Sequence, residues 1–199
     1  MKILSCAAAI LALSMVSACV APVGPVEVTR FHVLDTASLG QGSISVEAAE
    51  GQQAQDLEFR TYAAAVSREL TRLGYSVFTP GGEPSRTAAT LSVERLVVRP
   101  ARDGGPVSIG VGGTTGSYGS GVGVGIGLDL SGPPPESIET RISVRIRDRQ
   151  SKETLWEGRA SFLARASSPL AQSQLGAAKM AEALFQDFPG QSGETILIE

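Results

Sequence analysis

The chain has 199 residues, of which 42% are hydrophobic, 19% charged and 5% aromatic. This composition is typical of a globular domain and differs from that of disordered or fibrous chains. The formal net charge is −3, whereas a nucleic-acid-binding domain normally carries a basic excess, so we expect no nucleic-acid partner. After the N-terminal segment, no apolar run is long enough to predict a membrane-spanning helix.

Residues 1–18 are predicted to be a signal peptide. Lys2 makes the N-terminus positive, and the apolar stretch that follows, Ile3 to Met15, has the length of a secretory h-region. It ends in Val16-Ser17-Ala18-Cys19. This resembles the bacterial lipobox, whose Cys receives a diacylglycerol before cleavage and is then acylated on its new amino group. Cleavage between Ala18 and Cys19 would remove 18 of the 199 residues and leave 181.

The alternative is an ordinary secretory signal with an incidental Cys. Cys6 lies in the segment to be removed, so the mature chain would hold Cys19 alone and could form no internal disulfide. Two or three acyl chains such as palmitate on one residue give stable anchorage, so we expect the membrane to be reached through Cys19. In lipoproteins of Gram-negative bacteria an Asp after the Cys favours inner-membrane retention. Val20 at that position predicts an outer-membrane lipoprotein facing the periplasm, with residues 19–28 as a lipidated tether.

Residues 29–199 are predicted to form one domain, which begins with short strands around one helix. The helix, residues 55–73, has apolar residues at helical spacing, and Gly74 stands where a helix often ends. We expect strands at 29–34, 42–46, 75–79 and 90–98, the last with a bulge near Glu94-Arg95. The apolar stripe of the helix consists of Phe59, Ala63, Val66, Leu70 and Leu73.

The second half predicts a strand pair followed by a second helix. Matching the apolar faces of the two strands places Ile146 opposite Trp156 and Arg145 opposite Glu157. Ser168 is predicted to cap the last helix, which would end at Pro189-Gly190, and residues 196–198 predict a short edge strand or a frayed end. The predicted fold class is therefore α+β, with a mainly antiparallel sheet, two helices packed on it and a glycine-rich β-hairpin.

The hairpin is predicted within residues 104–132, which hold 12 of the 23 glycines. A nucleotide-binding loop is disfavoured, because no Lys or Arg lies between Arg102 and Arg141 and three prolines follow where a helix would have to begin. Val, Ile and Leu instead alternate with Gly. This pattern predicts two strands with one apolar face and one bare backbone face that a neighbouring element, another protomer or a partner could approach. A low-complexity loop is the alternative.

No group of residues predicts catalysis, a metal site or a cofactor. His32 is the single His, no free Cys would remain in the mature chain, and no G-x-S-x-G elbow occurs. The acidic pairs Glu47 with Glu50 and Asp56 with Glu58 lie in polar stretches typical of a solvated surface. We therefore expect a protein that is not an enzyme. An enzyme would need a pocket joining His32 to an Asp or Glu.

Arginine residues form a basic stripe on the strand that contains Ile146. Such a stripe could bind lipid phosphates, lipopolysaccharide or the peptide carboxylates of the cell wall. The alternative is a solvated face balanced by Glu139, Glu153 and Glu157. The stripe consists of Arg141, Arg145, Arg147 and Arg149.

Taken in order, these segments resemble a known family. The resemblance rests on the lipobox, Leu73-Gly74-Tyr75, the Gly-Val-Gly-Val-Gly-Ile-Gly segment, an Asp148 turn followed by Leu155-Trp156-Glu157-Gly158, and Phe188-Pro189. This order is similar to that of the bacterial lipoproteins of the domain-of-unknown-function 4136 family. The resemblance implies an α+β lipoprotein on the periplasmic side of an envelope membrane and carries over no catalytic residue.

The function expected from the sequence is therefore that of a non-enzymatic, lipid-anchored envelope protein with an accessory or interaction role and an envelope protein as partner. The alternative is a carrier of a lipid or other apolar molecule, held between the sheet and the helix that contains Val66 and Leu70. The candidate partner contacts are Val122, Val124, Ile126, Arg141 and Arg145.

Overall fold

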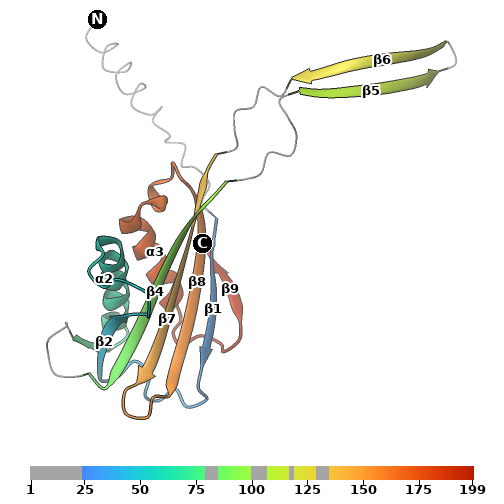
Figure 1. Cartoon of the computed structure of the whole chain (residues 1–199). Coiled ribbons are helices and arrows are strands. Elements are labelled where there is room, and N and C mark those ends of the chain that lie inside the picture. Colours follow the sequence, from blue (N-terminus) through green and yellow to red (C-terminus); the bar gives the residue numbers. More distant parts are fainter. Residues whose placement is uncertain (1–23, 79–84, 100–106, 117–118, 129–134) are drawn as a thin grey trace, which may run out of the picture.

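The computed structural model describes residues 24–78, 85–99, 107–116, 119–128 and 135–199 (Figure 1). The predicted signal peptide, the cleavage site and Cys19 lie outside these residues. Most of the described chain forms one sheet with helices on one face. A separate two-stranded ribbon is formed by a segment that lies, in the sequence, between two strands of that sheet.

The main sheet has seven strands in the order β3-β2-β4-β7-β8-β1-β9. Its centre is formed by the longest strands, β4, β7 and β8, and short strands lie at both edges. The strands are β1 (Val26–His32), β2 (Ser43–Ala48), β3 (Ser76–Phe78), β4 (Thr87–Val98), β7 (Ser137–Asp148), β8 (Thr154–Arg165) and β9 (Thr195–Ile198).

The prediction of a mainly antiparallel sheet is wrong, because the sheet is mixed. β2 pairs in parallel with both β3 and β4, whereas the pairs from β4 to β9 are antiparallel. The helix between β2 and β3 explains the difference. It carries the chain back to the end of the sheet where β2 began, and a crossover of this kind joins parallel strands. The α+β class and the two packed helices are as predicted.

Two α-helices, α2 (Leu57–Arg72) and α3 (Ser173–Phe185), lie side by side on one face of the sheet (Figure 1). Helix α2 begins and ends close to the predicted residues. The backbone of Gly74 has φ +105°, a conformation that L side chains rarely adopt, as expected of a glycine that ends a helix. Of the predicted stripe, Phe59, Val66 and Leu70 are buried. Tyr62 and Ala65 are buried too, so the apolar face is wider than the stripe.

The predicted register of β7 and β8 is confirmed. Ile146 lies opposite Trp156 and Arg145 opposite Glu157. The predicted bulge near Glu94-Arg95 is wrong, since β4 and β7 pair without interruption along β4. The irregularity instead follows Ile146, between β7 and β8.

The chain around Ser168 departs in detail from the prediction. Ser168 caps a three-residue 3-10 helix, Pro169–Ala171, by accepting a hydrogen bond from the Leu170 backbone N–H at 3.3 Å. Helix α3 begins after this turn, at Ser173. The C-terminal segment forms an edge strand, β9, paired antiparallel with β1.

The glycine-rich segment forms the predicted hairpin of β5 (Val107–Gly116) and β6 (Gly119–Leu128). The two strands pair antiparallel, with Val111 opposite Val124 and Gly112 opposite Gly123. They make up the two-stranded ribbon, apart from the seven-stranded sheet. Among the described residues, no helix has the length and apolar character needed to cross a membrane.

Candidate functional site

A hollow of about 370 Å³ lies on the sheet face opposite the helices. It forms where small hydroxyl side chains stand between longer charged ones on β4, β7, β8 and β1. Two cross-strand rows build it by register, one of Glu94, Arg141, Ser161 and Glu27, the other of Ser92, Ser143, Arg159 and Thr29. We call this the sheet hollow. Charged side chains of both signs and hydroxyl groups line it together with Ile142 and Ala160, and more of its accessible surface is apolar than polar.

Alternation along each strand produces the sheet hollow. On β7, Ile142 and Val144 point into the core, so Arg141, Ser143 and Arg145 point away from the helices. The same alternation on β8 buries Ala160 and Phe162 and turns Arg159 and Ser161 outward. Burial of the helix-side face therefore fixes where the polar side chains stand.

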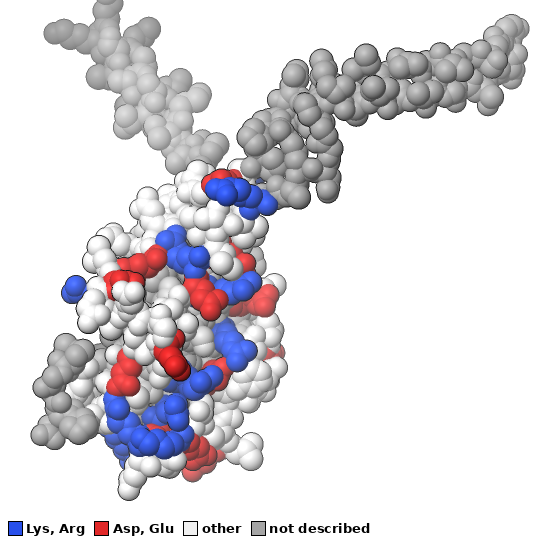
Figure 2. Space-filling view, in the orientation of Figure 1, with Lys and Arg blue, Asp and Glu red and all other residues white. Residues whose placement is uncertain are grey.

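Ion pairs bind most of the arginine stripe to neighbouring acids. Arg141 contacts Glu139 at 2.7 Å, and Arg145 contacts Glu157 at 2.9 Å. Arg149 pairs with Glu47, and Arg147 donates to the Lys152 carbonyl oxygen at 3.3 Å. The face resembles the balanced alternative considered above, with Glu47 in the place expected for Glu153. In Figure 2, cationic and anionic side chains are interspersed along the molecule.

Glu157 lies between Arg145 of the stripe and Arg159 on its own strand, which contacts it at 2.7 Å. Burial would raise the pKa of Glu157, but hydrogen bonds and charges from Arg145 and Arg159 outweigh that effect and hold the pKa below its usual range. The carboxylate therefore stays ionised at neutral pH and does not supply a proton there. Its role is to hold two cations in place at the rim of the sheet hollow.

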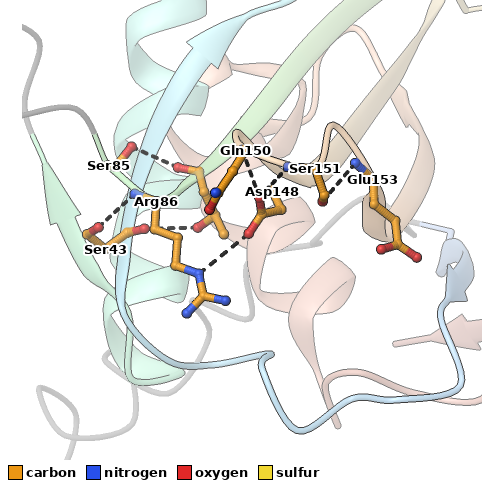
Figure 3. A network of polar contacts seen from close by, with 8 residues as sticks. Ser43, Ser85, Arg86, Asp148, Gln150, Ser151 and Glu153 are labelled. Atoms are coloured by element: carbon orange, nitrogen blue, oxygen red, sulfur yellow. Dashed lines mark hydrogen bonds and ion pairs between the residues drawn. The ribbon is translucent and has the colours of Figure 1, made fainter.

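A polar network closes the end of the sheet where β7 ends (Figure 3). The Asp148 carboxylate accepts hydrogen bonds from the backbone N–H groups of Gln150 at 2.8 Å and Ser151 at 2.9 Å, and Arg86 approaches it at 3.5 Å. These two backbone bonds chiefly hold the pKa of Asp148 below its usual range. The Arg86 N–H donates to Ser43 Oγ at 2.9 Å. The network fixes the β7–β8 turn, which explains why an Asp stands there.

The Trp156 motif has a structural explanation. Trp156 is fully buried, its ring stacks on Phe185 with centroids 5.3 Å apart, and its Nε1 donates to the Pro189 carbonyl oxygen at 3.0 Å. The indole lies over Gly158, where an added Cβ would collide with the Trp156 ring and come within 2.8 Å of Leu184 Cδ1. The Leu-Trp-x-Gly and Phe-Pro segments therefore meet in one packed unit.

Arg30 is a buried cation that the sequence pattern did not single out. It is 3% exposed, and its guanidinium donates to the carbonyl oxygens of Leu184 at 3.0 Å and Ala183 at 2.9 Å, at the end of α3. Burial lowers its pKa, against the opposing charges of Asp187 and Glu194. A cation is favourable at a helix C-terminus. Strand alternation could have predicted its burial, because Arg30 lies on the same face of β1 as buried Val28 and partly buried His32.

His32 and the acidic pairs stand apart from the sheet hollow. The ring nitrogens of His32 contact two backbone carbonyl oxygens, that of Val33 at 2.7 Å and that of Gly190 at 3.2 Å. Glu58 accepts a hydrogen bond from Ser173 Oγ at 2.6 Å and pairs with Arg95. Within the described ranges, no group of three His, Cys, Asp or Glu side chains is placed to hold a metal ion.

A second cavity, of about 730 Å³, lies beside α2 at the edge formed by β2 and β3. Its lining is largely apolar and includes Val46, Ala48, Phe59, Ala63, Val77 and Phe78. Val66 and Leu70 are fully buried in the core. The cavity therefore lies at the edge of the sheet, and Val66 and Leu70, between which and the sheet an apolar molecule was expected, do not line it.

The predicted contact residues do not form one surface by register. Arg141 and Arg145 lie on β7 beside the sheet hollow, while Val122, Val124 and Ile126 share one face of β6 in the hairpin. Sequence reasoning missed Glu94, Arg159 and the serine positions 92, 143 and 161, although strand alternation places them on the face of Arg141. The missing information was which strands are neighbours.

The comparison with known families decides the relationship. The profile described as "Domain of unknown function (DUF4136)" matches residues 28–190. The chain belongs to this family. A protein of Zymomonas mobilis subsp. mobilis, described as uncharacterized, is 27% identical over 212 residues, which cover 86% of this chain and 79% of the relative.

Two solved structures are similar in part. A PDZ domain protein from Parabacteroides distasonis matches with a TM-score of 0.46 and 11% identity, over 88% of this chain and 39% of the other. The PelC dodecamer from Paraburkholderia phytofirmans matches with a TM-score of 0.48 and 10% identity, over 84% and 99%.

Proposed function

We propose that this DUF4136 protein is a lipid-anchored envelope lipoprotein that acts by binding another envelope protein and catalyses no reaction. The observation that carries the proposal is the N-terminal pattern, an apolar h-region ending in Val16-Ser17-Ala18-Cys19. Only six residues, 20–25, separate Cys19 from the start of β1 at Val26. A domain on so short a tether works close to its membrane, and outer-membrane delivery with a periplasmic domain follows from Val20.

The sheet hollow supports a binding role. It combines hydroxyl groups with both signs of charge on a face that none of the described helices covers. Mixed charges of this kind select a partner by complementarity and suit specific recognition better than nonspecific adhesion. The ion pairs of Glu157 with Arg145 and Arg159 favour one arrangement of these side chains before a partner binds, which lowers the entropic cost of binding.

The anchor is tested by mass spectrometry of the protein purified from envelope membranes. We expect an N-terminal Cys19 carrying a diacylglyceryl group and an amide-linked acyl chain. Cys19→Ser should abolish the modification and release the protein from the membrane fraction. An unmodified chain beginning at another residue would overturn the anchor.

Binding is tested by site-specific photocrosslinking in cells, with the crosslinking residue at Ser143 in the sheet hollow. A discrete protein adduct is expected, and Arg141→Glu should remove it while leaving membrane anchorage intact. Arg68→Glu is the matched control, because it makes the same charge change on the exposed side of α2. Loss of the adduct in both variants, or in neither, would contradict recognition at the sheet hollow.

The apolar cavity beside α2 favours one second candidate, a carrier of a lipid or other apolar molecule. A volume of about 730 Å³ lies within the range of small-molecule sites. Native mass spectrometry of protein isolated from the envelope should then show a bound apolar molecule, which Ala63→Trp would displace. Repeated recovery of unliganded protein would exclude this candidate.

A further inference from the structure

One end of the seven-stranded sheet gathers the chain segments that face the proposed anchor. At this end β4 finishes at Val98, opposite Ser137 at the start of β7, and Ser137 lies opposite Arg165 at the end of β8. β1 begins at the same end, because Glu27 lies opposite Ser161. We call it the hairpin end, since the chain leaves β4 for the β5–β6 hairpin here and returns to β7.

The hairpin end exposes apolar side chains. Leu96 is 47% exposed, Val97 58% and Leu163 50%. Leu96 and Leu163 lie in one cross-strand row on either side of Glu139. Exposed Arg99, which pairs with Glu136 at 2.6 Å, and exposed Arg165 stand at the same end. Apolar side chains edged by arginines are typical of surfaces that meet a lipid headgroup region, because the long cationic side chains extend toward phosphates.

The register of the hairpin divides its residues into two faces. One face holds the cross-strand pairs Val107–Leu128, Ile109–Ile126 and Val111–Val124. The other holds eight glycines with Ser108 and Thr114. A two-stranded hairpin is marginal in water by itself, so the apolar face needs a cover.

We propose that the β5–β6 hairpin lies on the phospholipid bilayer with its apolar face toward the acyl chains, as a second membrane contact beside the lipid at Cys19. The inference rests on the proposed anchor for the position of the hairpin end. Residues 19–25 reach at most about 24 Å, so the hairpin end stays within this distance of the lipid attachment. Each ten-residue strand is about 33 Å long, enough to lie across many lipids.

A lipid surface fits this hairpin better than a protein does. Residues 104–128 contain no charged side chain, so the hairpin brings no charge into an apolar medium. Pairing of the two strands satisfies the inward-pointing half of their backbone N–H and C=O groups. In a hairpin lying flat at the membrane surface, the outward-pointing half lies at the two edges, within reach of water and lipid headgroups. A contact that selects one protein partner would be expected to include charged or aromatic anchors on the binding face.

Fluorescence quenching tests the contact on the acylated protein, reconstituted into vesicles of phosphatidylethanolamine and phosphatidylglycerol. The acylated chain has no free thiol if Cys6 is removed with the signal, so one introduced Cys carries the label. A label at Val124→Cys, on the apolar face, should be quenched strongly by brominated acyl chains. A label at Gly125→Cys, on the glycine face, should be quenched less. A label at Ser151→Cys, in the turn at the opposite end of the sheet, is the control and should not be quenched.

Vesicle binding of the non-acylated Cys19→Ser protein separates this inference from the anchor. We expect weak binding, reduced roughly tenfold by Ile109→Asp with Val124→Asp, because carboxylates on a lipid-facing surface oppose insertion. Ser108→Asp with Thr114→Asp adds the same charge to the glycine face and should have a much smaller effect. Absence of acylation would overturn the anchor alone. Equal quenching of the labels at positions 124 and 151 would overturn the hairpin contact. Crosslinking of the apolar face to a protein, with no quenching by lipid, would also overturn it.

Discussion

The two faces of the seven-stranded sheet are built from the same strands but by different interactions. The helix-covered face is filled with buried apolar side chains, among them Trp156. The helix-free face carries ion pairs such as Arg145–Glu157 around the sheet hollow. Buried apolar packing contributes far more to stability than exposed ion pairs. Side chains on the helix-free face can therefore serve binding with little cost to the fold.

The largest effect is expected from Trp156→Ala on the covered face. Loss of the stacked indole should lower the free energy of unfolding by about 3–5 kcal/mol, because the cavity cannot close fully. Urea unfolding followed by circular dichroism measures it. Leu163→Ala, on the open face of the same strand, should change the value by about 0.5 kcal/mol or less. Similar losses for both would remove the contrast between the faces.

Gly158→Ala is expected to cost about 1–3 kcal/mol, since the added methyl group must displace the Trp156 ring and Leu184. Near-ultraviolet circular dichroism should report the altered packing of the indole. Ser161→Ala, three residues along β8 in the sheet hollow, is the matched control and should leave both stability and spectrum unchanged. An unaltered Trp signal in Gly158→Ala would contradict the proposed packing.

Arg30→Met tests whether a polar contact matters when it is buried. Two carbonyl oxygens at the end of α3 would lose their donors, at a cost of about 2 kcal/mol. Hydrogen exchange should show faster opening of the last turn of α3. Arg30→Lys retains the charge, so its free energy of unfolding should lie between those of Arg30→Met and the original protein. If Arg30→Met were as stable as the original protein, the contacts to α3 would be dispensable.

The smallest effect is expected for Glu157→Gln on the open face, about 1 kcal/mol or less at pH 7. The arginines lower the pKa of Glu157 in the folded protein, so the stability they give is present above the unfolded value of about 4.3. It is lost as the pH falls through the lower, folded value. The difference in unfolding free energy between the two proteins should therefore shrink between pH 7 and pH 3. A difference independent of pH would show that the charge of Glu157 does not contribute.

Periodicity predicted the features that depend on one strand and its sequence neighbour. The alternation of Ile142, Val144 and Ile146 fixed the register with Trp156, and the Gly-Val alternation fixed the hairpin. Neighbours distant in the chain could not be read this way. The parallel pairing of β2 with β4 joins strands that α2 and β3 separate in the chain, and the periodicity of a single segment does not show such a pairing.

The candidate site shows the same limit. Arg141 and Arg145 were found because they repeat along one strand. Arg159 and Glu94 became part of the sheet hollow only when β8 and β4 were known to flank β7. Arg30 was hidden for another reason, since its partners are backbone carbonyl oxygens, which every residue type carries.

The two outer strands of the seven-stranded sheet are short, which affects how readily another chain could pair with its edges. β3 has three residues and β9 has four, so each border offers few backbone groups to an additional strand. The seven-stranded sheet therefore gives a strand of a neighbouring copy few backbone groups to pair with.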